Sequence, residues 1–238
     1  LDIARYMQSA PKNLKYDRSQ KAYRATRDFK PAYILPDSQS FLNQFVAVSV
    51  GTLPSSFSFI GWQPPYEIVQ HPTRAIRPEF LRSVMWAIRD VADIELSYQS
   101  MRDPAPSRRW ISPHAVAFDG SRWHVRAWCH QNGDFRDFVF ARIQQVYRSR
   151  KSEINSKSDT LWNTQATIIL KPRIGLTKQQ RLAIEKEYEM KNGALRLVTR
   201  KALVAYVARQ LRLDRNEELP PAMQPLQWVN ENEFKQLL

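Results

Sequence analysis

Cysteine is almost absent from this sequence, since Cys129 is the only one among 238 residues. A single cysteine excludes an internal disulfide and a zinc site made of several cysteines. It fits a reducing compartment, so we expect a cytoplasmic protein in which Cys129 is a small buried apolar side chain.

Long apolar runs are also missing. No stretch approaches the ~20 consecutive apolar residues that a membrane-spanning helix needs, and no basic amphipathic helix suited to a lipid surface stands out. We therefore expect no membrane partner. The chain begins at Leu1 without a methionine or a secretory signal, which suggests that it is cut from a longer protein.

Negative charge is scarce relative to positive charge. The chain has 36 lysines and arginines against 23 aspartates and glutamates, a formal net charge of +13. Such an excess usually serves the binding of a polyanion rather than folding, and nucleic acid is the obvious partner. An apolar content of 43% supports folded cores, and the length allows two modest domains.

Known catalytic motifs are absent as well. There is no H-E-x-x-H, no glycine-rich phosphate loop with lysine, no G-x-S-x-G and no cluster of carboxylates at metal-binding spacing. An enzyme remains a competing hypothesis, because a nuclease site could be assembled on paper from His71, His114, His124, His130, Asp93, Glu95 and Asp103. We expect no catalytic residues, no metal and no cofactor.

Residues 1–33 are typical of the end of a winged helix-turn-helix. A short helix over 2–9 stops before Pro11, and apolar and basic residues alternate on both sides of a polar turn over 13–23, which predicts a β-hairpin. This segment carries eight lysines and arginines and three aspartates. A solvated basic arm is the alternative to DNA contact. The DNA-binding candidates are Arg5, Gln8 and Ser9 for base edges, and Lys12, Lys15, Arg18 and Lys21 for phosphates, with Tyr16 beside them.

Residues 34–74 are rich in proline and predict a connector that packs one helix, over 38–50. That helix could instead make dimer contacts, and the sequence leaves both interpretations open.

Residues 75–150 predict one helix followed by consecutive antiparallel strands. Pro78 opens an amphipathic helix, and strands are expected over 93–99, 109–118, 122–129 and 135–140. Asp119-Gly120 is a strong hairpin signal, and 131–134 forms the next turn. This pattern indicates a small, strongly bent sheet or barrel.

A polar stretch from Arg148 predicts an exposed linker, with 151–163 separating the barrel from a second unit over 164–238. That unit has a βαβα order, with strands over 167–171 and 195–199 and helices over 177–191 and 201–211. The fold class is therefore α+β.

Arginine replaces lysine in the middle of the chain. No lysine lies between Lys30 and Lys151, yet residues 74–150 contain thirteen arginines. Strand alternation predicts one cationic and aromatic face with Arg122, His124, Arg126 and Trp128. The other face packs inward with Trp123, Val125, Ala127 and Cys129.

Two interpretations of these arginines stay open. They could form a concave anion site, suited to nucleotides or single-stranded nucleic acid because guanidinium binds phosphate in a two-pronged geometry and bases stack on aromatic rings. They could instead be scattered surface charges that neutralise Asp103, Asp119, Asp134 and Asp137.

The run from Arg108 to His130, followed by Phe135-Arg136-Asp137-Phe138 and Ala141-Arg142-Ile143, closely resembles a WYL domain. The naming tripeptide stands here as Trp123-His124-Val125, which keeps the Trp and replaces the Tyr and the Leu. This variant looks like the subgroup of regulators found with bacterial phage-defence systems of the BREX and CBASS types, which are dimeric repressors with a winged helix-turn-helix, a WYL domain and a C-terminal extension.

The resemblance implies a barrel of Sm-like type over 75–150 and a dimerisation domain over 164–238. It also implies a ligand pocket formed by Tyr98, Ser100, Arg109, His114, Arg122, His124, Arg126, Arg136 and Arg142. The function that follows is a homodimeric, sequence-specific repressor of a phage-defence operon, whose WYL domain binds an anionic nucleotide or oligonucleotide effector that controls binding to double-stranded operator DNA. The alternative is an RNA or single-stranded DNA binding protein that uses the basic barrel as its primary surface.

Overall fold

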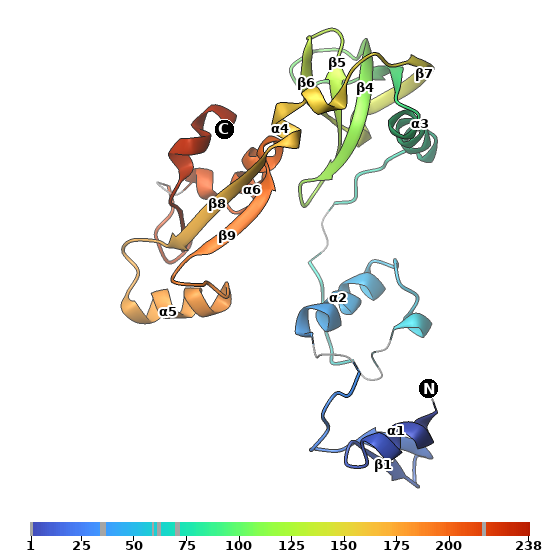
Figure 1. Ribbon diagram of the computed structural model, residues 1–238, viewed down its shortest axis with the longest axis vertical. Coiled ribbons are helices and arrows are strands. Elements are labelled where there is room, and N and C mark those ends of the chain that lie inside the picture. Colours follow the sequence, from blue (N-terminus) through green and yellow to red (C-terminus); the bar gives the residue numbers. More distant parts are fainter. Residues whose placement is uncertain (1, 34–36, 59, 61–62, 70–71, 216–217) are drawn as a thin grey trace. The chain divides into compact units, whose positions relative to one another are not determined.

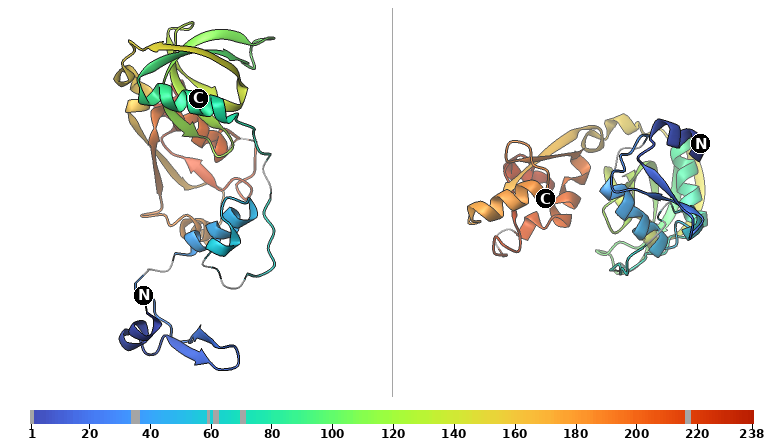
Figure 2. Two further views of the ribbon diagram at one scale, coloured as in Figure 1. Left: turned by 90° about the vertical axis from the view of Figure 1, so that its right-hand side faces the viewer. Right: turned by 90° about the horizontal axis from the view of Figure 1, so that it is seen from below.

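The computed structural model describes residues 2–33, 37–58, 60, 63–69, 72–215 and 218–238. The chain divides into two compact units, Leu1–Gln70 and His71–Leu238, which are described separately. The ribbon is shown in Figures 1 and 2. No described helix is long and apolar enough to cross a membrane.

The first unit begins with the helix and hairpin that the sequence predicts. The elements are α1 (Ile3–Ser9), β1 (Leu14–Asp17) and β2 (Ala22–Ala25), and the two strands pair antiparallel. The carboxylate of Asp17 accepts hydrogen bonds from the amides of Ser19 and Gln20, which fixes the turn between the strands. Tyr16 and Tyr23 stand opposite each other and their ring centroids lie 5.0 Å apart.

Asn13 holds the helix and the hairpin together, and the sequence analysis gave it no role. Its side chain is 4% exposed. The amide nitrogen donates to the hydroxyl of Tyr6 at 2.7 Å and to the carbonyl of Lys30 at 2.5 Å, and the amide oxygen accepts from the Lys30 amide at 3.0 Å. One buried side chain therefore connects α1, the start of the hairpin and the segment that follows it.

The proline-rich segment packs one helix, as predicted. This helix is α2 (Ser38–Ser49), which is capped by Asp37 and followed by the short helix η1 (Ser55–Phe57). Phe45 is buried and its ring lies 4.8 Å from that of Tyr66. Leu42 and Val46 are exposed, so dimer contact by this helix stays a prediction.

The second unit begins with a helix and a bent five-stranded antiparallel sheet (Figure 1). The elements are α3 (Pro78–Arg89), β3 (Ala92–Tyr98), β4 (Ser107–Phe118), β5 (Trp123–Cys129), β6 (Asp134–Val139), η2 (Phe140–Arg142) and β7 (Ile143–Lys151). The strand order is β6-β5-β4-β3-β7. Gly120 and Gly133 have φ angles of 88° and 63°, which the two tight turns require and which glycine adopts without strain.

The core of this sheet is apolar and includes Cys129, as predicted. Phe80 and Val84 of α3 pack against Leu96, Ile111 and Val125 of the strands, and Cys129 is fully buried. The hydroxyl of Tyr98 on β3 accepts a hydrogen bond at 3.0 Å from the amide of Val139, the last residue of β6. This bond joins two strands that are not neighbours in the sheet and supports its curvature.

The structure differs from the sequence analysis at β7. Residues from Arg148 were expected to be an exposed linker, yet the strand runs to Lys151 and pairs with β3. β7 lies at the edge of the sheet, so most of its side chains are exposed and it has no apolar alternation. It is held partly by Arg148 and Arg150, which bind Glu95 and Asp93 at 2.9 and 3.0 Å.

The C-terminal part is a three-stranded antiparallel sheet with helices (Figure 2). Its elements are β8 (Gln165–Pro172), α5 (Lys178–Glu187), β9 (Leu195–Arg200), η4 (Lys201–Leu203), α6 (Val204–Gln210), η5 (Leu213–Arg215), β10 (Leu226–Trp228) and η6 (Glu231–Leu237). The predicted βαβα order is confirmed. The helix expected to reach residue 191 ends at Glu187, and β10 and η6 were not predicted.

The connection between the two sheets is short and partly buried. It contains η3 (Ser156–Ser158) and the four-residue helix α4 (Thr160–Asn163). Asp159 caps α4 by accepting from the Trp162 amide at 3.1 Å, and it is only 1% exposed. A fully buried carboxylate in a segment expected to be exposed marks this region as the candidate site.

Candidate effector site and DNA-binding surface

Arg126 on β5 is a buried cation that binds a carboxylate from outside its own sheet. It is 4% exposed. Its Nε and Nη2 atoms donate to the two carboxylate oxygens of Asp159 at 2.7 and 2.9 Å. This two-pronged geometry is the strong form of the arginine–carboxylate pair. The cationic face of β5 is therefore covered at Arg126 by the segment that leads to the C-terminal part.

Three more side chains complete this group, which we call the Arg126 cluster: Arg126, Asp159, His114, Asp137 and Tyr206. His114 Nε2 lies 3.0 Å from Asp159 Oδ2, and Arg126 Nη1 lies 3.3 Å from Asp137 Oδ1. The Tyr206 hydroxyl of α6 donates to Asp137 at 3.0 Å. The cluster therefore joins β4, β5 and β6 of the first sheet to α4 and α6.

The ionisation of the cluster follows from burial and hydrogen bonding. Burial raises the pKa of Asp159, but the bonds from Arg126 and the Trp162 amide outweigh burial and leave this pKa below its usual value. Burial and the nearby charge of Arg126 lower the pKa of His114 by more than the Asp159 and Asp137 carboxylates raise it, so the imidazole is neutral at pH 7. Burial and the charge of Asp137 raise the pKa of Tyr206. At neutral pH the cluster contains one guanidinium and two carboxylates.

A second group surrounds Asp119 in the β4–β5 turn. His124 Nε2 and Arg122 Nε lie 2.9 and 3.2 Å from the Asp119 carboxylate. Burial raises the pKa of Asp119, but the bond to His124 and the backbone amides of Ser121 and Arg122 outweigh burial and hold the pKa well below its usual range. The His124 ring also lies 4.9 Å from the ring of Tyr206, which connects this group to the Arg126 cluster.

Two buried nitrogens in the predicted pocket have no hydrogen-bond partner within the described part of the chain. They are Nδ1 of His124 and Nε of Arg109. The Arg109 side chain is 9% exposed, lies 3.5 Å from Asp103 and sits over the ring of Tyr98 at 5.6 Å. Buried polar atoms without partners are rare and point to a bound ligand or water.

The remaining predicted pocket residues lie apart. Ser100 accepts a hydrogen bond from the Arg102 amide, and Arg142 is half-buried. Arg136 is exposed and stands opposite Ala127 in the strand register, whereas Arg126 stands opposite Asp137. Because adjacent residues of a strand point to opposite faces, Arg126 and Arg136 do not share a face.

The neutralising interpretation of the arginines also has support. Asp103, Asp119 and Asp137 are paired with Arg109, Arg122 and Arg126. What the sequence analysis missed is Asp159 and Tyr206. An Asp followed by Thr-Leu-Trp is a helix N-cap signal, so Asp159 could have been placed at a helix start. No local signal identifies Tyr206, because its role depends on tertiary packing.

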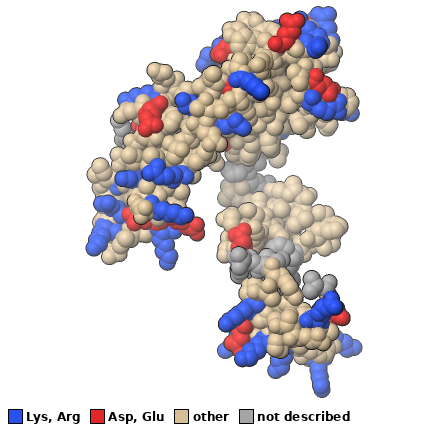
Figure 3. All heavy atoms as spheres, viewed as in Figure 1, with Lys and Arg blue, Asp and Glu red and all other residues tan. Residues whose placement is uncertain are grey.

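The DNA-binding candidates form an exposed basic surface on the first unit (Figure 3). All eight predicted residues are exposed: Arg5, Gln8, Ser9, Lys12, Lys15, Tyr16, Arg18 and Lys21. Among the described residues no acidic side chain pairs with any cation of this set, whereas Arg24 is paired with Asp17 at 3.2 Å. Lys15 stands directly opposite Arg24, so the hairpin presents two cations side by side.

Family comparisons match three consecutive parts of the chain. Residues 1–47 match the BrxR transcriptional regulator winged helix-turn-helix domain, residues 79–148 match the WYL domain, and residues 165–234 match the BrxR C-terminal dimerization domain. The DNA-binding transcriptional repressor CapW of Escherichia coli (strain KTE188) is 37% identical over 240 residues, which cover 100% of this chain and 80% of that protein. The chain belongs to the CapW family.

Further CapW repressors show the same similarity. The Pseudomonas aeruginosa CapW is 36% identical over 240 residues, covering 100% of this chain and 80% of the relative. The Stenotrophomonas maltophilia CapW is 37% identical over 242 residues, covering 99% and 79%. A solved structure, proteasome accessory factor B/C of Arthrobacter aurescens, covers 69% of this chain and 26% of that chain at 14% identity and a TM-score of 0.31. That score supports no structural argument.

CapW proteins are regulators rather than enzymes, and one serine–histidine–aspartate group in the chain does not form a catalytic triad. Ser112 Oγ donates to Asp93 at 2.5 Å and lies 2.9 Å from His130 Nε2. Asp93 reaches the same Nε2 atom of His130, at 3.2 Å. A triad needs the aspartate on the opposite ring nitrogen from the serine, so this group serves to bind Arg150 of β7.

Proposed function

We propose that this chain is a cytoplasmic, homodimeric repressor that contacts operator DNA through α1 and the β1–β2 hairpin. Family membership identifies it as a DNA-binding transcriptional repressor with a C-terminal dimerization domain. We propose in addition that the WYL domain binds an anionic nucleotide or oligonucleotide effector, and that this effector controls binding to the operator of a phage-defence operon.

The proposed contact with DNA is based on the exposed, unpaired cations of the first unit. Lys12, Lys15, Arg18 and Lys21 are exposed around the hairpin, and no described acidic side chain neutralises them. Phosphate groups beside these cations would neutralise their charge, and release of counterions adds affinity. Arg5, Gln8 and Ser9 of α1 are exposed, and their side chains carry hydrogen-bonding groups that can reach base edges.

Lys15→Ala combined with Arg18→Ala tests this surface. We expect weaker binding to the upstream intergenic duplex and to a scrambled duplex alike, with a log–log salt slope reduced by about 2, since each lost phosphate contact removes about 0.9. Surface plasmon resonance at several salt concentrations measures both. Lys178→Ala with Lys186→Ala removes the same charge from exposed positions on α5 and is the matched control. A salt slope equal to that of the unmodified protein contradicts the assignment.

The effector proposal rests on the Arg126 cluster and its neighbours. The Arg126 guanidinium and the His114 imidazole meet at the buried Asp159 carboxylate, and the Tyr206 phenol binds the neighbouring Asp137. His124 Nδ1, which has no described partner, lies in the adjoining group. Guanidinium binds phosphate and carboxylate in the same two-pronged geometry. The site can therefore accept a phosphate oxyanion of a nucleotide or of a nucleic-acid backbone.

Arg126→Lys tests the effector site while keeping the buried charge. Lysine is a point charge that cannot make the two-pronged contact, so we expect the affinity for a short oligothymidylate to fall by roughly tenfold, the effect of about 1.4 kcal/mol. Operator affinity without the oligonucleotide should stay within about twofold. Arg136→Ala is the control and should bind the oligothymidylate as the unmodified protein does. Arg136 was predicted to line the pocket, but it lies on the opposite face of the sheet from Arg126. Equal affinities for all three proteins would refute the site.

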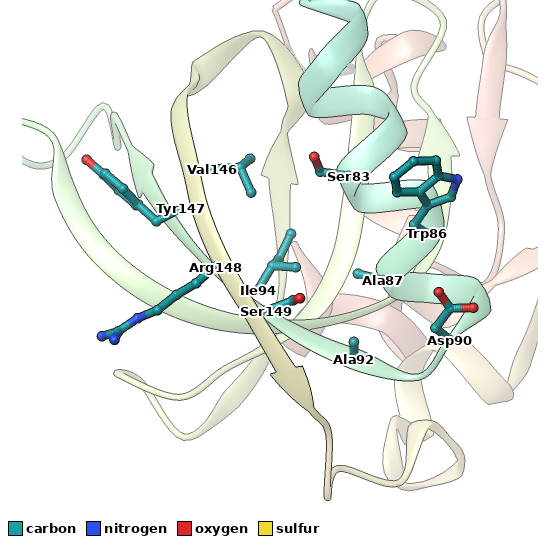
Figure 4. A pocket seen from close by; sticks show the side chains of 10 residues that line it. All are labelled: Ser83, Trp86, Ala87, Asp90, Ala92, Ile94, Val146, Tyr147, Arg148 and Ser149. Atoms are coloured by element: carbon teal, nitrogen blue, oxygen red, sulfur yellow. The ribbon is translucent and has the colours of Figure 1, made fainter.

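A second candidate function is supported by arginines stacked on aromatic rings outside the cluster. A pocket of about 240 Å³ between α3 and β7 has Trp86 on one side and Arg148 on the other (Figure 4). Trp86 is 54% exposed, and Arg82 lies over its ring at 5.4 Å. Such a surface suits single-stranded nucleic acid as the main target. This candidate predicts that Arg126→Lys leaves oligothymidylate binding intact, so the same titration distinguishes the two.

A further inference from the structure

The charge of the Arg126 cluster conflicts with anion binding as the site stands. One guanidinium faces the carboxylates of Asp137 and Asp159, and His114 is neutral because burial lowers its pKa. The cluster is therefore already negative by one charge at pH 7. A further anion would be repelled strongly in such a buried place, where opposing charges are poorly screened. An oxyanion can bind Arg126 only if one carboxylate leaves.

The two carboxylates differ in how firmly the backbone holds them. Asp137 lies within β6, in register with Arg126, and both strands are paired along their length. Asp159 lies in the connection between β7 and β8, where it caps a helix of only four residues. A helix this short has little stability of its own. Asp159 is therefore the carboxylate that can move away without unfolding a strand.

Asp159 also occupies the position that an effector oxyanion would take. Its two oxygens receive Arg126 Nε and Nη2 at 2.7 and 2.9 Å, and one of them lies 3.0 Å from His114 Nε2. Two oxygens on one centre, bound by one guanidinium fork, are the arrangement that a phosphate group presents. The side chain is thus the chemical equivalent of the ligand proposed for this site.

α4 is bound to the C-terminal part by contacts that do not involve Asp159. Arg200 of β9 donates to the Trp162 carbonyl at 2.6 Å, and its guanidinium lies 4.7 Å from the centre of the Trp162 ring. The Lys201 amide donates to the Thr164 carbonyl at 2.9 Å. The bond from Asp159 to Arg126 therefore ties the part that matches a dimerization domain to the barrel.

We propose that Asp159 is an internal ligand of the anion site, and that a phosphate-bearing effector acts by replacing it on Arg126 and His114. Displacement of Asp159 removes the cap of α4 and the contacts of Asp159 with Arg126 and His114. Within the cluster, the bond from Tyr206 to Asp137 still joins the barrel to the C-terminal part. This inference rests on the proposed effector function and adds the way in which binding is converted into a change between domains.

Asp159→Asn is the direct test, because asparagine keeps an acceptor for the Trp162 amide and is a good N-cap, while the charge is lost. Titration calorimetry with inorganic pyrophosphate, and separately with a short oligothymidylate, is done on the full chain. We expect the variant to bind at least one probe roughly tenfold or more tightly than the unmodified chain, the factor for a site that is nine-tenths occupied by its own carboxylate. Asp134→Asn makes the same chemical change at an exposed position of β6 and should change nothing.

A second measurement keeps the proposal testable if Asp159→Asn perturbs folding. Pyrophosphate or the oligothymidylate, added to the unmodified protein, should speed hydrogen exchange at the Trp162 amide, whose acceptor is the Asp159 carboxylate. If Asp159→Asn binds pyrophosphate more tightly than the unmodified chain does, a free phosphate group is sufficient as ligand. If only the oligothymidylate binds more tightly to the variant, the ligand is a nucleic-acid backbone.

The outcomes separate the two proposals. Equal or weaker binding by Asp159→Asn, with clear binding by the unmodified chain, overturns the role of Asp159 and leaves the effector site standing. An unchanged exchange rate at the Trp162 amide, on saturation with a probe, also overturns the role of Asp159 and not the effector site. Absence of binding to both probes by both proteins overturns the effector site and this inference together.

Discussion

Two carboxylates of the barrel, Asp119 and Asp93, each bind several partners rather than one. Asp119 binds Arg122, His124 and two backbone amides, and Asp93 binds Ser112, His130 and Arg150. Removal of one member of a buried charged set leaves the others unpaired in a place with little water, which costs more than the contact itself contributes. Substitutions at these positions are therefore best made isosteric.

The Asp119 carboxylate should make stability depend on acid pH. Its pKa in the folded protein lies well below the value of about 3.9 for an unfolded chain. A lowered pKa stabilises the fold fully above the unfolded value, and this contribution is lost as the pH falls below about 4. Asp119→Asn should lower the melting temperature at pH 7 and reduce the further loss between about pH 5 and 3.

Differential scanning calorimetry across this range checks the prediction. Asp134→Asn, at an exposed position without a described ion pair, should keep the full acid dependence. A variant at position 119 whose melting temperature falls with pH as steeply as that of the unmodified chain would show that Asp119 does not contribute.

At the scale of elements, the hairpin of the first unit depends on one buried contact to α1. Asn13→Ala leaves the amide and carbonyl of Lys30 and the hydroxyl of Tyr6 without their partner, at a cost of about 1–3 kcal/mol. We expect faster hydrogen exchange at the Lys30 and Thr26 amides and weaker duplex binding. Pyrophosphate binding should be unchanged, because Asn13 lies outside the unit that contains the proposed effector site.

Asn43→Ala is the matched control for this substitution, since Asn43 is exposed on α2 and its side chain accepts only from Gln39 among the described contacts. Slower or unchanged exchange at Lys30 in Asn13→Ala would mean that the strands hold the hairpin without this side chain.

Elements with a strong periodic or turn signal could be predicted from the sequence. Pro78 and the spacing after it place α3, and Asp119-Gly120 places the turn before β5. β7 shows no apolar alternation, because most of the side chains of this edge strand are exposed and only the one at its start is buried. β10 has three residues, too few to show alternation.

The candidate site could be predicted only in part, for a physical reason. Alternation along β5 correctly places His124 and Arg126 on one face, but it does not reveal what covers that face. The groups that cover it are Asp159, which lies 33 residues after Arg126 in the chain, and Tyr206 of α6. Contacts between distant segments depend on how two sheets pack, and no local pattern encodes them.

At the scale of the molecule, dimerization should multiply the affinity for DNA. The C-terminal part matches a dimerization domain, and a symmetric dimer presents two copies of the basic hairpin surface. Two half-sites spaced by a whole number of helical turns then bind both copies at once. We expect an upstream duplex with one half-site scrambled to bind roughly a hundredfold more weakly than the intact duplex.

Half-site scanning of the upstream duplex by surface plasmon resonance measures this effect, with sedimentation velocity to establish the dimer at the same concentration. A loss of about twofold, which is the statistical effect of halving the number of independent sites, would mean that each chain binds DNA alone.

Trp162 lies between the two parts that the effector is proposed to separate. Its ring centroid is 5.9 Å from that of His114, and Arg200 stacks on it from the C-terminal sheet. Indole emission responds to the polarity and the quenching groups around the ring, and departure of Asp159 from Arg126 alters both. Occupancy of the site can therefore be followed by stopped-flow fluorescence of the unlabelled protein, with Trp162→Phe to identify the contribution of Trp162 among the seven tryptophans.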